Sequence, residues 1–200
     1  TKASTSSTRS NASLPCTATP LSASGTARSS RPLNSSTPWG TSGVPILASL
    51  QNETNTLESY FNVKVVEKNE GFTIGGVFFN LIQTVHVRSG FAIAPSFGLM
   101  IMTMQGTRVF LTTDSQHCPS DILDFYKSAN AIFHDCECTN FKSGVHAHFD
   151  ELATLPPDIK AKIQLVHYQD LVLADWDTWE AKARAAGFVG FVRAGVEQEF

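Results

Sequence analysis

The segment SGVHAHFDEL, residues 143–152, concentrates side chains that could carry out chemistry. It reads His-x-His-x-Asp-Glu, one residue away from His-x-His-x-Asp-His, a known signature of two-metal sites. Neutral imidazoles and carboxylates are ligands that zinc accepts. A histidine can also move protons near neutral pH. Taken alone, the segment leaves two interpretations open: it could be a metal-binding motif or a different functional element.

Three short apolar segments each end on a residue that could bind a metal: Asp114 after VFLTT, Asp135 after AIFH, and His167 after QLV. Each has an ordinary alternative; Asp114 could cap the following helix and His167 could be strand-end packing. In layered α/β folds, however, a rigid sheet aims the residues at its strand ends into a cleft. Their recurrence in one chain therefore favours a functional site.

Beyond about residue 57, hydrophobic periodicity and turn residues predict a compact α/β domain. Residues 88–96 are expected to be a loop, and Pro119 is expected in the first turn of a helix. The predicted strands are 59–66, 76–87, 97–104, the apolar part of 105–114, 130–135, 164–168, 188–195 and 196–200. The predicted helices are 120–129, a short piece from residue 148, 158–163 and 175–187.

Residues 1–45 have a different composition from the rest of the chain. Up to residue 43 there is no Asp or Glu, and nearly half of the residues are Ser or Thr. Such a segment buries too little apolar surface to offset its ordering entropy, so we expect it to be disordered. Residues 51–200 carry all 18 acidic residues but only 11 of the 15 Lys and Arg, a formal charge of −7. This acidic balance argues against a dominant nucleic-acid-binding surface.

Four cysteines, at positions 16, 118, 136 and 138, are fewer than a small secreted scaffold would carry, so reduced thiols are expected. Cys136 and Cys138 could bind a soft metal, but without a second pair we favour buried thiols. No apolar run approaches the ~20 residues that span a bilayer. We therefore expect a cytoplasmic protein with no membrane partner.

The motifs VFLTTDSQ, FHDCE and KSGVHAHFDEL…IQLVHY follow an apolar strand that carries His86. In this order they resemble the C-terminal half of the metallo-β-lactamase-fold hydrolases, in particular the ribonuclease Z and phosphodiesterase-like branch. The resemblance covers residues 57–200. It implies an α/β fold, the αββα sandwich of that family, here incomplete on its N-terminal side, with residues 46–200 forming its C-terminal part.

The resemblance also implies two divalent metal ions, usually zinc, with manganese as the other option. His86 is similar to the third histidine of the first ion, Asp114 to the carboxylate that bridges both ions, and His167 to the distal histidine of the second ion. A carboxylate can span two ions ~3.5–4 Å apart, and the ions turn a bound water into a hydroxide nucleophile near neutral pH. The implied reaction is hydrolysis of a phosphodiester, either a cyclic nucleotide or RNA.

The same resemblance implies that residues 143–152 are not the metal-binding motif of the family. In the ribonuclease Z-like branch this place holds a histidine that is not a metal ligand and works with an acidic residue at the preceding strand end. His146 matches that histidine best, His148 is the second choice, and Asp135 is the acidic partner. The implied role of His146 is to stabilise a phosphoryl oxygen or to protonate the leaving group.

One part of the family pattern is missing, because no histidine precedes His86 and the upstream His-x-His-x-Asp-His signature is absent. We expect the native fold to begin near residues 44–57 and residues 1–45 to be non-native or translated from another frame. The alternative to an enzyme is a catalytically impaired relative that acts as a scaffold or dimer partner. For the enzyme, the expected partners are a small-molecule or nucleotide phosphodiester and, as in many relatives, a second copy in a homodimer.

Overall fold

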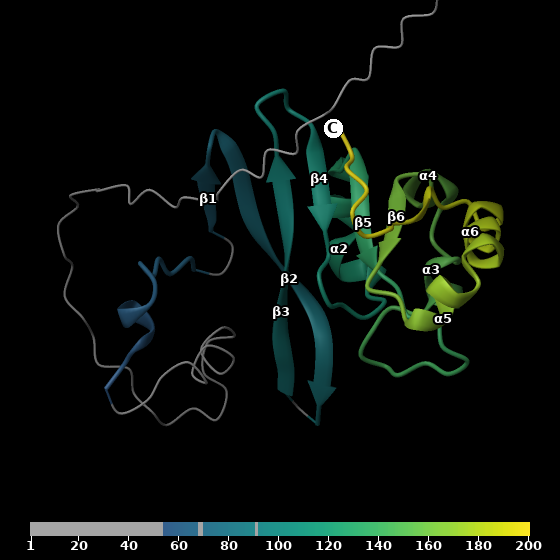
Figure 1. Cartoon of the computed structure of the whole chain (residues 1–200), viewed down its shortest axis with the longest axis horizontal. Helices are drawn as coiled ribbons and strands as arrows, with labels where there is room; N and C mark the ends of the chain where they lie inside the picture. The colour runs from purple at the N-terminus through teal and green to yellow at the C-terminus, as the bar shows by residue number, and fades with distance from the viewer. Residues whose placement is uncertain (1–53, 68–69, 91) are drawn as a thin grey trace, which may run out of the picture. The chain divides into compact units, whose positions relative to one another are not determined.

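The computed structural model describes residues 54–67, 70–90 and 92–200. All of them belong to the second of the chain's two compact units, Pro38–Phe200. The low-complexity segment 1–45 and Cys16 lie outside the described residues. Figure 1 shows the described strands as one sheet, whose seven members are neighbours in the same order as in the sequence: β1 (Gly71–Ile74), β2 (Val77–Ser89), β3 (Ala92–Met102), β4 (Arg108–Leu111), β5 (Ala131–Asp135), β6 (Ile163–Val166) and β7 (Gly190–Phe191).

The first four strands pair antiparallel. β1 and β2 are joined by Gly75 and Gly76, whose φ angles of 58° and 82° suit a tight two-residue hairpin turn. The pairing of β2 with β3 shifts between Val85 and Val87, so His86 is the extra residue of a β-bulge. A bulge bends its strand and re-aims side chains, and His86 Nδ1 lies 2.7 Å from the carbonyl oxygen of Val145.

Two expectations about this half of the sheet are wrong, and one strand is additional. Residues 59–66 form no strand; η1 (Leu57–Ser59) is a single 3₁₀ turn, and no regular structure follows it up to residue 67. Strand β1 was not expected. The expected loop 88–96 is mostly strand, because β2 and β3 stay paired as far as Ser89 and Ala92, with a turn at Gly90.

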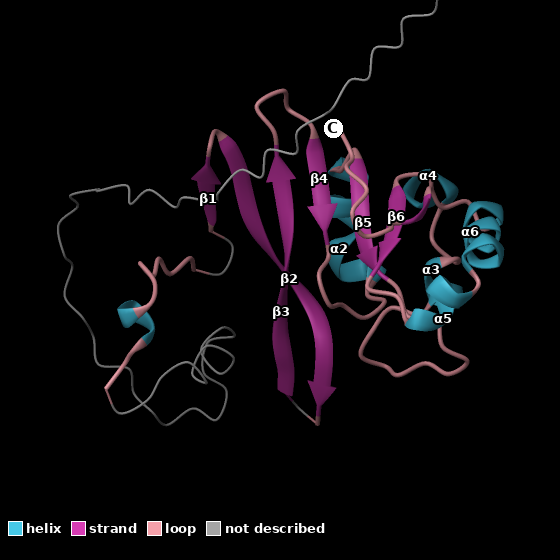
Figure 2. Ribbon diagram, in the orientation of Figure 1, coloured by secondary structure: helices cyan, strands magenta, loops and turns pink. Residues whose placement is uncertain are grey.

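The last four strands pair parallel, β4 with β5, β5 with β6 and β6 with β7. Parallel strands need crossovers, and Figure 2 shows helices at these connections and after β6. They are α2 (Pro119–Ser128), α3 (Phe149–Leu152), α4 (Pro157–Lys160), α5 (Asp170–Ala174) and α6 (Trp176–Ala185). The expected helices are present. Of the two expected closing strands, 188–195 is reduced to the two residues of β7, and residues 196–200 form no strand.

The core lies where α2 and the later helices cover the parallel strands. Helix α2 begins with Pro119 in its first turn and buries Ile122 and Tyr126, one helical turn apart, against Phe110 and Ile132 of β4 and β5. In the same core, Phe149 packs between Trp179, Phe188 and Phe191. Both tryptophans of α6, Trp176 and Trp179, pack against this core.

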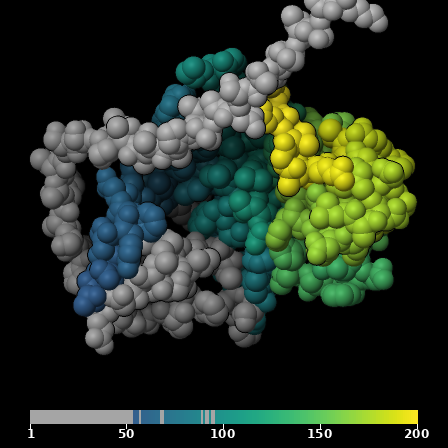
Figure 3. All heavy atoms as spheres, viewed as in Figure 1, coloured from purple at the N-terminus to yellow at the C-terminus, as the bar shows by residue number. Residues whose placement is uncertain are grey.

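The residues after β7 run back along the sheet, as the yellow segment in Figure 3 shows. There the Phe200 ring meets the Phe133 ring at a centroid distance of 5.7 Å, and Gln198 donates a hydrogen bond to Gln164 of β6. This segment covers the outer side of β5 and β6, away from the helices around Phe149. In the part of the chain that the structure describes, none of the helices has the length and apolar character needed to cross a bilayer.

Candidate active site

The parallel strands β4, β5 and β6 carry the candidate site at their C-terminal ends, where residues from adjacent strands meet at one edge of the sheet. Asp135 is the last residue of β5, His167 directly follows β6, and Asp114 follows β4 after two residues. Thr113 and His167 both have positive φ, 53° and 58°. Such backbone angles cost energy in residues other than glycine and concentrate at functional sites.

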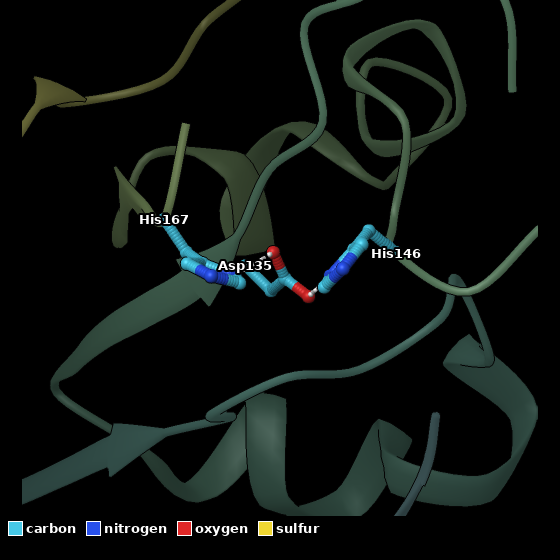
Figure 4. A group of neighbouring side chains, drawn as sticks. All are labelled: Asp135, His146 and His167. Carbon is cyan, nitrogen blue, oxygen red and sulfur yellow. Dashed lines mark hydrogen bonds and ion pairs between the residues drawn. The ribbon is translucent and has the colours of Figure 1, made fainter. Parts of the chain in front are cut away.

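Asp135 lies at the centre of this edge and is completely buried. Figure 4 shows its two carboxylate oxygens directed at two different histidines. Oδ2 is 2.6 Å from His146 Nδ1 and also accepts a hydrogen bond from the backbone N–H of Ser115 at 2.8 Å. Oδ1 is 3.2 Å from His167 Nδ1. Because these three donors satisfy the carboxylate, its burial is compatible with a negative charge.

His167 also contacts the second carboxylate of the site. Its Nδ1 lies 3.3 Å from Asp114 Oδ1, and both of these side chains are about half exposed, at 53% and 52%. The carbonyl oxygen of Asp114 accepts a hydrogen bond from Ser96 Oγ of β3, which anchors the turn after β4. The structure thus brings His167 into direct contact with both Asp114 and Asp135.

His86 joins the same cluster through His146. The centroids of their rings are 4.9 Å apart, and the His146 ring is 5.0 Å from the His167 ring. His86 Nδ1 lies 2.7 Å from the carbonyl oxygen of Val145. The sequence predicted six site residues. Five of them occupy one site, and the exception is His148. The five are His86, Asp114, Asp135, His146 and His167.

The three histidines of this cluster share a useful arrangement. In each ring Nδ1 faces an oxygen that can only accept, a carboxylate or a carbonyl, so the proton belongs on Nδ1. The lone pair of each neutral ring is then on Nε2. Metal-binding histidines in proteins are held in the same way, with one ring nitrogen donating to an oxygen while the other binds the ion.

His148 has a different position and both of its ring nitrogens are occupied. Nδ1 accepts a hydrogen bond from the Asp150 backbone N–H at the start of α3, and Nε2 lies 2.8 Å from the Thr139 carbonyl oxygen. The Glu151 side chain accepts from the His148 backbone N–H, which completes a capping box. His148 therefore begins a helix, and its ring has no free nitrogen for catalysis.

His134 and His117 lie off the predicted motif positions. His134 is completely buried; its Nδ1 donates to the Asp135 carbonyl oxygen and its Nε2 lies 2.5 Å from Tyr126 Oη. Burial lowers the pKa of His134 to about 4, so its ring is neutral. Its hydrogen bond to the Asp135 carbonyl oxygen holds the backbone of that residue. His117 is half-buried, burial lowers its pKa, and it lines a small hollow of about 80 Å³ beside His146.

Two polar residues of the site carried no signal in the sequence analysis. Gln116 Nε2 donates to the carbonyl oxygens of His86 and Gly144, which ties the bulge of β2 to the loop that carries His146. Glu137 is buried and accepts hydrogen bonds from the same loop. Their roles follow from contacts between segments distant in sequence, which spacing along the chain does not reveal. Cys118, Cys136 and Cys138 are buried free thiols, as expected.

The donor set fits a divalent metal ion. One ligand atom each from Asp135, His146 and His167 lie within 4.8 Å of one another. Imidazole nitrogens with a carboxylate oxygen are typical zinc ligands, and among the described residues no ion pair brings a Lys or Arg to these side chains. His86 and Asp114 offer a further nitrogen and oxygen at the edge of this group.

Comparison with known proteins identifies the family to which the chain belongs. Residues 37–197 match the family model of Anti-Pycsar protein Apyc1. Two proteins of that name are each 28% identical to the chain: one from Paenibacillus harenae over 124 residues, 61% of this chain and 48% of the relative, and one from Paenibacillus xerothermodurans over 127 residues, 60% of this chain and 47% of the relative. The chain thus spans about half the length of these curated relatives.

Among solved structures, the chain is similar to the metallo-β-lactamase fold protein YhfI from Bacillus subtilis, with a TM-score of 0.51 and 18% sequence identity. The similarity covers 74% of this chain and 57% of that protein. At this identity the likeness establishes the fold and nothing further, and it confirms the fold class expected from the sequence. The chain has the metallo-β-lactamase fold and belongs to the Anti-Pycsar protein Apyc1 family.

Proposed function

We propose that this protein is a metal-dependent hydrolase of phosphodiesters, and that its substrate is a small cyclic nucleotide. One observation carries the proposal: His86, Asp114 and His167, which come from three separate segments, share a cluster with the paired Asp135 and His146. Metal ligands beside an acid–base pair can together catalyse hydrolysis of a phosphodiester.

In this proposal His86, Asp114 and His167 hold the divalent ions, with the Nε2 atoms of the two histidines and the Asp114 carboxylate as ligands. When bound, the ions would supply a nucleophile by lowering the pKa of water and would offset negative charge on the phosphoryl oxygens. Zinc suits these ligands best, and manganese is the second choice. The half-exposed positions of Asp114 and His167 leave room for a substrate phosphate at this edge.

His146 is the proposed acid–base residue. Its Nδ1–H is fixed on Asp135 Oδ2 at 2.6 Å, which orients the ring. Nε2 is then the atom that donates a proton to the leaving oxygen, or a hydrogen bond to a phosphoryl oxygen. His148 does not fit this role, because both of its ring nitrogens are engaged in hydrogen bonds at the start of α3.

The charge of the chain favours a small substrate over a long one. Each phosphate of RNA that a protein neutralises calls for a Lys or Arg, and residues 51–200 carry 11 of these against 18 acidic residues. A cyclic nucleotide presents one phosphodiester, which the metal ions and His146 can contact by themselves. For this reason the cyclic nucleotide is preferred to the RNA phosphodiester.

The test is cleavage by the full chain, with zinc or manganese, of a bis-aryl phosphate ester, a set of cyclic nucleotides and a single-stranded RNA. We expect metal-dependent cleavage of the ester and of a cyclic nucleotide, lost with a chelator. His146→Ala should lower kcat about 10²–10⁴-fold, whereas Asp124→Ala, on the exposed side of α2, should not. Absence of turnover by a metal-loaded chain would favour the non-enzymatic alternative, and preferential cleavage of RNA would overturn the choice of substrate.

A further inference from the structure

Glu137 is a buried acidic side chain that the proposed reaction does not use. It is 3% exposed, and among the described residues no ion pair joins it to a Lys or Arg. Its Oε2 accepts hydrogen bonds from the Ser143 backbone N–H at 2.9 Å and from Ser143 Oγ at 3.0 Å. Its Oε1 lies 3.3 Å from Thr139 Oγ1. Burying a carboxylate costs free energy unless the carboxylate is hydrogen-bonded. Here all the hydrogen-bond donors to the Glu137 carboxylate belong to one loop.

That loop, residues 139–146, follows β5 and ends on His146. The backbone of Glu137 closes its base: the Glu137 N–H donates to the Ala147 carbonyl oxygen at 2.8 Å, and the Phe149 N–H donates to the Glu137 carbonyl oxygen at 2.9 Å. The side chain of Glu137 then holds the middle of the loop at Ser143. Both ends and the centre of the loop are thus fixed on one residue.

From Ser143 to His146 the chain is short and contains the positive-φ residue Gly144 (φ 76°). Ser143 Oγ also accepts a hydrogen bond from the Val145 N–H at 3.3 Å, directly before His146. A shift of Ser143 would therefore be passed to His146 through two residues. The 2.6 Å contact between His146 Nδ1 and Asp135 Oδ2 depends on that position.

We propose that Glu137 is a positioning residue, which holds the 139–146 loop so that the His146 ring stays on Asp135. This inference rests on the proposed function for the role of His146, but the hydrogen bond that it concerns exists in the chain without metal or substrate. A direct measurement of that bond therefore tests the inference independently of any activity.

Two substitutions of Glu137 separate its hydrogen bonds from its charge. In Glu137→Gln, the amide oxygen can accept both Ser143 donors, and the amide NH₂ can donate to Thr139 Oγ1, so the loop stays anchored. In Glu137→Ala, the Ser143 N–H and hydroxyl lose their acceptor. The matched control is Glu180→Ala, because Glu180 accepts from the Phe191 N–H and also holds a strand to the rest of the fold, yet contacts nothing in the loop.

The experiment is proton NMR of the full chain without metal, following the His146 Nδ1–H resonance, which a carboxylate acceptor moves downfield of the backbone amides. The resonance is assigned by its loss in His146→Ala. We expect it in the unsubstituted chain, in Glu137→Gln and in Glu180→Ala, and we expect it to be lost by exchange in Glu137→Ala. If Glu137→Ala fails to fold, Ser143→Ala takes its place and should weaken the resonance.

Kinetics with the bis-aryl phosphate ester give the second readout. Glu137→Ala should lower kcat about tenfold to a hundredfold with KM nearly unchanged, since a misplaced catalytic group affects the reaction more than binding, and Glu137→Gln should restore kcat. A resonance that persists in both Glu137→Ala and Ser143→Ala would overturn the positioning role, whatever happens to kcat. If no variant shows turnover while the resonance behaves as expected, the positioning role stands and the proposed function fails.

Discussion

At the scale of single residues, the two oxygens of Asp135 serve two different histidines. Oδ2 orients His146, the proposed acid–base group, while Oδ1 contacts His167, a proposed metal ligand. A single buried carboxylate thus sets the proton position on both rings. This coupling explains why the last residue of a short apolar strand is a charged one, which would otherwise be unfavourable inside a protein.

Asp135→Asn should therefore damage both stability and activity. The amide can replace one acceptor, but its NH₂ then faces an Nδ1–H, leaving a buried donor unpaired. We expect a loss of about 1–3 kcal/mol in the free energy of unfolding and of at least about 10²-fold in kcat. Urea denaturation and ester cleavage measure these, with Asp124→Asn on the exposed face of α2 as the control. Equal stability of the two variants would contradict the role given to Asp135.

His134 makes the stability of the fold depend on pH. Burial lowers its pKa from the ordinary 6.5 to about 4, so the unfolded chain takes up a proton there before the folded one does. The stabilisation from the neutral ring is complete above pH 6.5 and is lost as pH falls towards 4, at about 1.4 kcal/mol per pH unit at most.

The check is urea unfolding of the unsubstituted chain and of His134→Gln across that pH range. Although the variant should be less stable at pH 7, because Tyr126 Oη and the Asp135 carbonyl lose their partner, its stability should fall less steeply with acid. The same slope in both proteins would show that other groups cause the pH dependence.

At the scale of elements, the site depends on where strands end and where one strand bulges. The ends of β4, β5 and β6 were predictable, because short, mainly apolar segments followed by Asp or His are typical of buried parallel strands. The bulge at His86 was not, since it is a matter of register between β2 and β3 and leaves no local pattern. The expected loop at 88–96 was wrong for a related reason. Its Gly and Pro residues suggested an interruption, but β2 and β3 stay paired through most of this segment.

The choice between His146 and His148 could not be made from the spacing of residues in the sequence. Both histidines stand in the same motif, and the sequence favoured His146 only through the family resemblance. The capping box between His148 and Glu151 decides which ring is free, and capping boxes are usually recognised from Ser or Thr at this place. The strand expected at 59–66 failed because alternation alone does not make a strand without a neighbour to pair with.

Gln116 links two of these elements, and its removal should loosen one of them selectively. Gln116→Ala takes away the donor to the carbonyl oxygens of His86 and Gly144. We expect faster hydrogen exchange at the amides of Val145 and Ala147, with little change at Leu165 in β6. Gln164→Ala, which removes only the exposed contact with Gln198, serves as the control. Uniform acceleration across the sheet would mean that Gln116 supports the whole fold and not the loop.

At the scale of the whole molecule, the described residues supply one sheet with its helices, and the chain spans about half the length of the curated relatives it matches. This single sheet nevertheless assembles His86, Asp114, Asp135, His146 and His167 at one edge. Composition could predict an acidic α/β domain, and motif order could predict the family. Neither could predict that the ring nitrogens would be oriented in advance by carbonyl and carboxylate oxygens.

The central claim is that these side chains form a metal centre, and calorimetric titration of zinc into the full chain tests it most directly. We predict that the unsubstituted chain binds zinc, that His167→Ala weakens the affinity by more than about tenfold, and that Cys138→Ala, which alters the buried thiol pair behind the site, leaves it unchanged. Zinc affinity that survives in His167→Ala but is lost in Cys138→Ala would contradict the account.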